Sequence, residues 1–221
     1  MKNEFLFVIT GANRGIGKYL TNLEYFRGAV ILQGKTDCDI TKPEQVKQLF
    51  ELLKNSGGEK KICLINCAGI NYNSFAHKAD LEQWSSVIDV NIKGTFNVIN
   101  TVLPMMRLLN WGRIINLSSV VGQTGVMGTS CYSASKSALT GMIKSIAMEN
   151  ACNGITINNL NLGYFNIGMI EQVPVEIRDK IKQTIPCKQF GNPKNIVNAI
   201  KFLIDSDYVN GSSIDINGGL Y

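Results

Sequence analysis

The sequence predicts an α/β protein built on an open, doubly wound parallel sheet. Continuous apolar runs rich in Ile and Val, without alternation of polar and apolar residues, are typical of strands buried on both faces of such a sheet. These runs occupy residues 5–10, 29–32, 62–66, 113–119 and 155–162, and a shorter one, SSIDING, covers 212–218. Helical stretches lie between them, and this alternation favours right-handed crossovers. A length of 221 residues suits one domain and is short for two.

Two of the connecting stretches carry clear helix signals. Residues 41–55 begin with Thr41 as a cap and Pro43 in the first turn, and their apolar positions share one stripe. Residues 192–205 repeat this scheme with Asn192 as the cap. The positions expected to face inward there are Ile196, Val197, Ile200, Phe202 and Leu203.

The composition limits the classes of function. With 45% hydrophobic and 18% charged residues, the chain is typical of a globular protein. Its net charge of +5 is modest and its Lys and Arg residues are scattered, so no nucleic-acid partner is expected. No apolar stretch approaches the roughly 18 residues that span a bilayer, so we expect no membrane partner and a cytoplasmic location. The six cysteines lack the spacing of a zinc site, and no metal site is predicted.

A glycine-rich turn follows the first predicted strand. The segment TGANRGIG, residues 10–17, places Gly11 at the tight turn, Gly15 where the backbone would approach a pyrophosphate, and Gly17 where helix and strand pack closely. A purely structural turn is the alternative, because a glycine pattern alone is weak evidence. Its position between a first strand and a first helix favours a dinucleotide cofactor.

A tyrosine and a lysine lie four residues apart in the helical segment YSASKSALTGMIKSIAM. At this spacing Tyr132 and Lys136 share one helix face and point into the same cleft. A tyrosine with a pKa of about 10 is a poor acid-base catalyst at neutral pH, and a neighbouring ammonium favours its phenolate. We therefore expect Lys136 to bring the pKa of Tyr132 toward neutrality. An amphipathic helix surface is the alternative, and Ser119, at the end of a predicted strand, favours catalysis.

Several motifs, in order along the chain, resemble those of the short-chain dehydrogenase/reductase family. TGANRGIG is similar to its cofactor turn, NCAG at 66–69 to its Asn-Asn-Ala-Gly element, and VNIKG at 90–94 to the part of its central helix that carries an asparagine. INLSS and YSASK resemble its active site, and GSSIDINGG at 211–219 its C-terminal strand and turn. The chain looks most like 3-oxoacyl-[acyl-carrier-protein] reductases. This resemblance implies a single Rossmann-type domain over residues 1–221.

The resemblance also implies roles for particular residues. Ser119 would polarise the substrate carbonyl, Tyr132 would donate a proton to the developing alkoxide, and Lys136 would bind the nicotinamide ribose. Asn91 would complete the catalytic set by holding a water in a proton relay. The hydride would come from a nicotinamide cofactor. The residues expected to contact that cofactor are Gly11, Asn13, Arg14, Gly15, Ile16, Gly17, Lys35, Asp39, Ile40, Asn66, Ala68, Gly69, Tyr132, Lys136 and Gly163.

The chain departs from the family pattern at two places. Near the nicotinamide, Leu162-Gly163 replaces a Pro-Gly pair and Ile167 a threonine, whose lost hydrogen bond would cost about 1 kcal/mol in cofactor affinity. The first helix has its usual length, to near Gly28, but roughly 20–25 residues are missing, which comprise the helix after the second strand and most of the following strand. The acidic residue that contacts the ribose of NAD at the end of the second strand is also absent, and Gln33, Gly34 and Lys35 stand there instead. Arg14 and Lys35 are placed to bind a 2′-phosphate, so NADP(H) is favoured, with NAD(H) as the alternative.

The sequence therefore predicts an NAD(P)H-dependent oxidoreductase that interconverts a ketone and a secondary alcohol, with Tyr132 as the acid-base group. A 3-oxoacyl thioester is the default substrate, and a sugar or secondary-metabolite carbonyl is the alternative. A degenerate dinucleotide-binding partner subunit is a second class of hypothesis. Residues 163–190 are expected to form a mobile substrate loop. A homo-oligomer, dimer or tetramer, is expected, and the candidates for its apolar surface, or for the core, are Phe96, Met105, Met106, Met142 and Met148.

Overall fold

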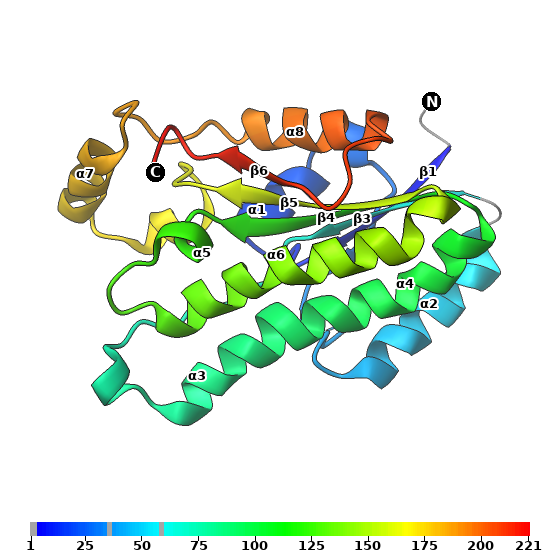
Figure 1. Ribbon diagram of the computed structural model, residues 1–221, viewed down its shortest axis with the longest axis horizontal. Helices are drawn as coiled ribbons and strands as arrows, with labels where there is room; N and C mark the ends of the chain where they lie inside the picture. The colour runs from blue at the N-terminus through cyan, green and yellow to red at the C-terminus, as the bar shows by residue number, and fades with distance from the viewer. Residues whose placement is uncertain (1–3, 35–36, 58–59) are drawn as a thin grey trace.

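A computed structural model of the chain describes residues 4–34, 37–57 and 60–221 (Figure 1). Its strands are β1 (Phe5–Thr10), β2 (Val30–Leu32), β3 (Lys61–Asn66), β4 (Gly112–Ser119), β5 (Ile155–Leu162) and β6 (Ser213–Ile216). They form one parallel sheet in the order β2-β1-β3-β4-β5-β6. Every residue of β4 and β5 is buried, which explains why polar and apolar residues do not alternate there. The predicted α/β class is confirmed.

Helices cover both faces of this sheet. One face carries α2 (Pro43–Gly57), α4 (Thr95–Leu108) and α6 (Ser130–Asn150), and the other carries α1 (Gly15–Thr21) and α8 (Lys194–Asp205). In Figure 1 the first group lies below the sheet and α8 lies above it. Each face buries its own apolar cluster, to which Val98 and Ile143 contribute on one side and Leu20 and Ile200 on the other.

Shorter elements connect these layers. They are α3 (Leu81–Ile88), α5 (Val121–Thr124), α7 (Val175–Thr184), the 3₁₀ turns η1 (Glu24–Phe26), η2 (Ala76–Lys78), η4 (Ala151–Asn153) and η5 (Gly168–Gln172), and the π-helical segment η3 (Asp89–Gly94). At the left of Figure 1, α5 and α7 lie beyond the carboxyl ends of the strands. This is the end of the sheet at which a ligand is expected.

The strand β2 forms one edge of the sheet, and the chain returns from it to the centre through α2. The described residues between Leu32 and Pro43 form turns, and α2 is the helix expected at 41–55. The family helix predicted to be missing after the second strand is absent from this described segment. A short connection stands in its place, and β2 pairs with β1 at the edge of the sheet.

The first helix is shorter than expected. It ends at Thr21 instead of reaching Gly28, and η1 follows it. Thr21 and Asn22 are weak helix formers, because β-branching restricts the threonine and the asparagine side chain competes for backbone hydrogen bonds. The chain therefore leaves the α-helical conformation here, before the glycine.

The helix α8 follows the sequence prediction except at one position. Asn192 caps its start, since the side-chain oxygen accepts the N–H of Lys194 at 2.9 Å. Four of the five predicted inward positions are buried, but Phe202 is 51% exposed. Phe202 lies outside the buried stripe of the helix, to which Ile200 and Leu203 belong.

A ladder of polar side chains crosses the sheet in register. Asn66 of β3 donates to Asn116 of β4 at 2.9 Å, and Asn116 donates to Asn159 of β5 at 3.1 Å. Thr10 of β1 and Ser213 of β6 extend this row at both ends. Each buried amide thus finds a partner, and a slip of one residue would leave several of them unsatisfied. The ladder therefore helps to fix the strand register.

Candidate active site

The strand order reverses between β1 and β3, because the chain runs outward from β1 to β2 and returns on the other side. Ligands of open α/β sheets bind in the crevice at such a point. The glycine turn follows β1 and the NCAG segment follows β3, so both line this crevice. The Thr10 hydroxyl ties them together by accepting the N–H groups of Cys67 and Ala68, each at 3.1 Å.

Gly11 lies where these two turns touch. Its φ is +65°, and a Cβ there would stand 2.6 Å from the Cα and N atoms of Ala68. A Cβ on Gly17 would stand 2.4 Å from the carbonyl oxygen of Gly11, so α1 packs directly on the turn. Backbone contact therefore requires glycine at both positions, as both interpretations of the turn predict.

Replacing Gly11 with alanine is expected to lower the free energy of unfolding by about 3 kcal/mol or more, because the methyl group would overlap backbone atoms that cannot rotate away. Gly28→Ala is the matched control. Gly28 has a φ of +80°, but nothing lies within 4 Å of its Cβ position. It should lose only about 1 kcal/mol, from backbone strain alone. Urea unfolding measures both variants, and equal losses would contradict the tight contact with Ala68.

The outer part of the glycine turn meets the start of the predicted substrate loop. Asn13 and Arg14 are exposed there. Gly15 has a φ of +53°, and a Cβ on it would stand 3.1 Å from the Cα of Gly168 in η5. The two backbones therefore pack against each other, and the sequence gives no sign of this contact. Gly168 also donates its N–H to the Glu171 carboxylate at 2.8 Å, which closes the η5 turn.

Ser119, Tyr132 and Lys136 come together beside this crevice. Ser119 ends β4, while Tyr132 and Lys136 occupy successive turns at the start of α6. Their exposed fractions are 9%, 8% and 6%. The Nζ of Lys136 lies 5.6 Å from the centre of the Tyr132 ring and donates to the carbonyl of Leu117 at 2.7 Å. A Cβ on Gly69 would stand 3.6 Å from this Nζ, so the lysine adjoins the NCAG turn.

The two serines at the end of β4 have different surroundings. The Ser119 side chain interacts with the Tyr132 hydroxyl, and its Oγ accepts the N–H of Val121 at 3.2 Å. Ser118 donates instead to the carbonyl of Lys136 at 3.2 Å. The arrangement therefore pairs Ser119 with Tyr132, as the sequence spacing predicts.

Burial changes the pKa values of the tyrosine and the lysine. It raises the pKa of Tyr132 to about 12, against a smaller opposing effect of the hydrogen bond with Ser119. It lowers the pKa of Lys136 to about 8, against a smaller opposing effect of Cys67. The expectation that Lys136 brings the Tyr132 pKa toward neutrality is wrong, because desolvation of the phenolate dominates. Tyr132 therefore keeps its proton at neutral pH.

Asn91 lies in η3, and its side chain is fully engaged. Its Oδ1 accepts the N–H of Ile70 and its Nδ2 donates to the Ile70 carbonyl, both at 2.9 Å. Nδ2 also donates to Ser135 Oγ at 3.0 Å, and Ser135 donates to the Tyr132 carbonyl at 2.8 Å. The Asn91 side chain thus anchors the residue after NCAG and, through Ser135, the start of α6. The predicted water relay stays a prediction. The sequence did not single out Ser135, whose signal was its place within YSASK.

Other residues expected near the adenosine lie in the turns after β2. The Asp39 Oδ1 accepts the N–H of Thr41 at 3.0 Å and its hydroxyl at 2.7 Å, so it fixes the turn before α2. Ile40 is buried, and its carbonyl accepts the Asn97 side chain at 2.9 Å. Lys35 lies outside the described residues.

The residues expected near the nicotinamide follow β5. Gly163 donates its N–H to the Ile216 carbonyl at 3.0 Å, and a Cβ on it would stand 2.7 Å from the Cα of Asn217. Ile167 and Ile16 both pack against the apolar cluster on the α1 and α8 face. The side chain at 167 therefore offers packing where the family has a hydroxyl.

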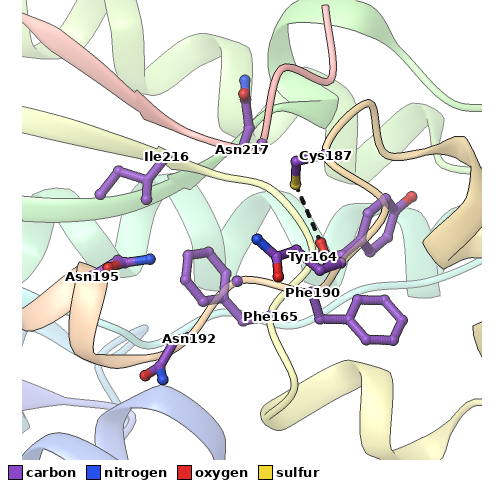
Figure 2. Close-up of a pocket in the computed structure, with 11 residues that line it drawn as sticks. Tyr164, Phe165, Cys187, Phe190, Asn192, Asn195, Ile216 and Asn217 are labelled. Atoms are coloured by element: carbon purple, nitrogen blue, oxygen red, sulfur yellow. Dashed lines mark hydrogen bonds between the residues drawn. The ribbon is translucent and has the colours of Figure 1, made fainter.

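A cavity of about 300 Å³ lies at the base of the predicted substrate loop (Figure 2). Both ends of this loop line it, together with Ile216 at the end of β6 and the next two residues, 217 and 218. Figure 2 shows Phe165 and Ile216 bordering the cavity, and the Cys187 thiol donates to the Gln189 carbonyl at 3.5 Å. Ser119 and Tyr132 are not among its lining residues.

Two other kinds of feature are not found in the part of the chain that the structure describes. Its His, Cys, Asp and Glu residues form no group of three that could hold a metal ion. Its helices include none that is long and apolar enough to cross a membrane.

Comparison with known proteins agrees with the fold. A family model described as enoyl-(acyl carrier protein) reductase matches residues 8–221. The chain belongs to the short-chain dehydrogenase/reductase family, whose members are oxidoreductases that use NAD(H) or NADP(H). It is 35% identical over 237 residues to the 3-oxoacyl-[acyl-carrier-protein] reductase FabG of Thermotoga maritima, with 96% of each chain covered. It is 36% identical over 180 residues to the acetoacetyl-CoA reductase of Cupriavidus necator, covering 80% of this chain and 73% of that relative.

A solved structure shares the same fold. It is a provisionally named gluconate dehydrogenase of Agrobacterium tumefaciens, with a TM-score of 0.86, 23% identity, and coverage of 99% of this chain and 96% of that one. The match to the Thermotoga reductase extends over 237 positions, more than the 221 residues present here. That relative therefore contains residues that this chain lacks, in agreement with a shortened segment.

Proposed function

We propose that this protein reduces a ketone to a secondary alcohol with NAD(P)H, and that the ketone is a 3-oxoacyl thioester. The observation that carries the proposal is the convergence of Ser119, Tyr132 and Lys136 beside the crevice formed by the glycine turn and NCAG. Tyr132 and Lys136 are nearly buried, which argues against the alternative of an amphipathic helix surface.

A dinucleotide would bind in the crevice, against the glycine turn. Side chains at Gly11 or Gly17 would overlap neighbouring backbone atoms, so glycine at both positions lets the turn, NCAG and α1 pack closely at the edge of the crevice. The Lys136 ammonium lies beside Gly69, and in the proposed complex it would bind the ribose hydroxyls of the cofactor. When bound, the cofactor supplies the hydride that adds to the carbonyl carbon of the substrate.

The protein's own residues orient the carbonyl oxygen of the substrate and give it a proton. The Ser119 hydroxyl donates a hydrogen bond to the carbonyl oxygen and orients it. Tyr132 is protonated at neutral pH, since burial raises its pKa to about 12, and it gives this proton to the oxygen as negative charge develops. The Lys136 ammonium, 5.6 Å from the ring, stabilises the phenolate that results. The carbon has then gained a hydride and the oxygen a proton, which gives the alcohol.

Two observations support an acyl thioester as the substrate. The Thermotoga and Cupriavidus relatives are named for 3-oxoacyl and acetoacetyl thioesters. Apolar side chains are exposed at the end of the sheet where the site lies: Val126 and Met127 after α5, and Val175 and Ile177 on α7. An acyl chain would cover such side chains. A sugar or secondary-metabolite carbonyl is the alternative.

We also propose that residues 163–190 move as a substrate loop of a single domain over residues 1–221. No described side chain of α7 is buried, and the cavity at the base of the loop leaves room for motion. For the proposed homo-oligomer, Phe96 and Met148 are exposed on α4 and α6, whereas Met106 is fully buried and Met105 and Met142 are partly buried. A cytoplasmic location, expected from the sequence, is also proposed.

The decisive experiment is NADPH and NADH oxidation with acetoacetyl-CoA, crotonyl-CoA and a keto-sugar nucleotide. We expect turnover of acetoacetyl-CoA with at least one of the cofactors. Turnover of crotonyl-CoA alone would replace ketone reduction by reduction of a carbon–carbon double bond. Cofactor binding without turnover of any substrate would favour the degenerate partner subunit.

A further inference from the structure

The carboxylate of Asp37 closes the turn that follows β2. Its Oδ2 accepts the N–H of Gln33 at 2.9 Å, and its Oδ1 accepts the N–H groups of Gly34 and Cys38, both at 3.0 Å. The sequence shows no acidic residue directly at the end of this strand, since Asp37 comes five residues after Leu32. The shortened connection folds it back to the strand end.

This strand end adjoins the glycine turn. The Ala12 N–H donates to the Leu32 carbonyl at 3.2 Å, and a Cβ on Gly34 would stand 3.7 Å from the Asn13 Nδ2. In dinucleotide-binding sheets, a side chain at this strand end meets the adenosine ribose. Asp37 therefore lies where the substituent at the ribose 2′ position would be recognised.

The Asp37 carboxylate can still accept a hydrogen bond from one more donor, but it cannot bind an anion. An ionised carboxylate has about four lone-pair positions. The backbone uses three of them, so Oδ2 can accept one more hydrogen bond, such as that of a ribose 2′-hydroxyl. A 2′-phosphate is an anion and would be repelled by the carboxylate. The N–H groups of Gln33 and Gly34, which could otherwise bind phosphate, already bond to Asp37.

Two carboxylates lie in the part of this turn that the structure describes. The pKa of the Cys38 thiol is raised, first by burial and then by the charges of Asp37 and Asp39, which places two carboxylates beside it. Arg14, the cation of the glycine turn, is exposed, and so is Asp37, so solvent screens the attraction of the first for a phosphate and the repulsion by the second alike.

We propose that Asp37 makes the cofactor site select NAD(H) over NADP(H). The inference rests on the proposed function for the existence of that site. It differs from the NADP(H) preference predicted from Arg14 and Lys35, which assumes a strand end without a carboxylate. Asp37 would thus take the role of the acidic residue that the family has at the end of the second strand, although it comes from a later position in the chain.

Equilibrium binding of NAD⁺ and NADP⁺ tests this selection without requiring turnover. The native chain should bind NAD⁺ more tightly, and Asp37→Asn should shift the ratio of the two dissociation constants toward NADP⁺ by about tenfold or more. Asp37→Ser should shift it in the same direction. Asp80→Asn is the matched control, because Asp80 is also exposed and accepts a backbone N–H, that of Gln83 at 2.9 Å, at the start of α3. It should leave the ratio unchanged.

The ratio is informative even if a variant is partly unfolded, because both constants come from the same preparation. An unchanged ratio in both Asp37 variants, with native binding intact, would overturn the inference alone, since Asp37 would then only close the turn. A native preference for NADP⁺ would overturn it as well. Failure of the native chain to bind either dinucleotide would overturn the proposed function together with the inference.

Discussion

The Tyr132→Phe variant is expected to lose kcat/KM for ketone reduction by about 10²- to 10⁴-fold, the usual contribution of a positioned general acid. The substitution removes only the hydroxyl that would give its proton to the substrate oxygen. The ring remains to fill its nearly buried position, so the free energy of unfolding should change by less than about 1 kcal/mol. Steady-state kinetics with acetoacetyl-CoA, beside urea unfolding, measures both quantities.

Cofactor binding separates loss of the proton donor from loss of the site. The dissociation constant for the preferred dinucleotide should stay within about threefold of the native value, a difference of less than 1 kcal/mol. Tyr208→Phe is the control, because this side chain is 98% exposed. It should leave the rate unchanged. Retention of most of the native activity by Tyr132→Phe would remove Tyr132 from the proposed chemistry.

The fold could be predicted because its signals are local in the sequence. The strands of the sheet centre are buried on both faces, so each of them produces a continuous run in which polar and apolar residues do not alternate. The glycines at 11 and 17 are required by contacts that a tight strand-turn-helix connection creates. The end of α1 was less predictable, because Thr21 and Asn22 only weakly oppose a helix and packing decides the boundary.

The candidate site was predictable where it depends on spacing along one element. Tyr132 and Lys136 are one helical turn apart, so their common face follows from helix geometry. The return of Asp37 to the end of β2 and the contact of Gly15 with Gly168 depend on tertiary packing, which no local pattern records. The predicted direction of the Tyr132 pKa shift was wrong for the same reason, because the shift depends on how deeply the folded chain buries the ring.

The Lys136→Met variant is expected to lose at least about 100-fold in kcat/KM, because the phenolate would have no ammonium beside it. The same variant should relieve a cost to the fold. Burial lowers the pKa of Lys136 from 10.5 to about 8. At pH 7 the charge of Lys136 therefore lowers the free energy of unfolding by about 3 kcal/mol, because the ammonium is more stable in the unfolded chain. Methionine has a similar shape and carries no charge.

The pH dependence of stability gives the sign of this effect. A lysine with a lowered folded pKa destabilises the fold fully below about pH 8, and the cost fades as the pH rises toward 10.5. The unfolding free energy of Lys136→Met minus that of the native chain should therefore be about 2 kcal/mol larger at pH 7 than at pH 9.5. The cysteines and Tyr132 titrate in both chains, so most of their contribution cancels in this difference.

A lysine elsewhere on the same helix provides the control. Lys144 is exposed on α6, so Lys144→Met should change neither the rate nor the pH dependence of unfolding. Urea unfolding of the three chains at the two pH values measures the effect. A Lys136→Met difference that stays constant with pH would mean that the buried ammonium costs the fold nothing. The loss of rate would then be the sole consequence of the substitution, whereas the expected result makes Lys136 a group that costs stability in order to support proton transfer.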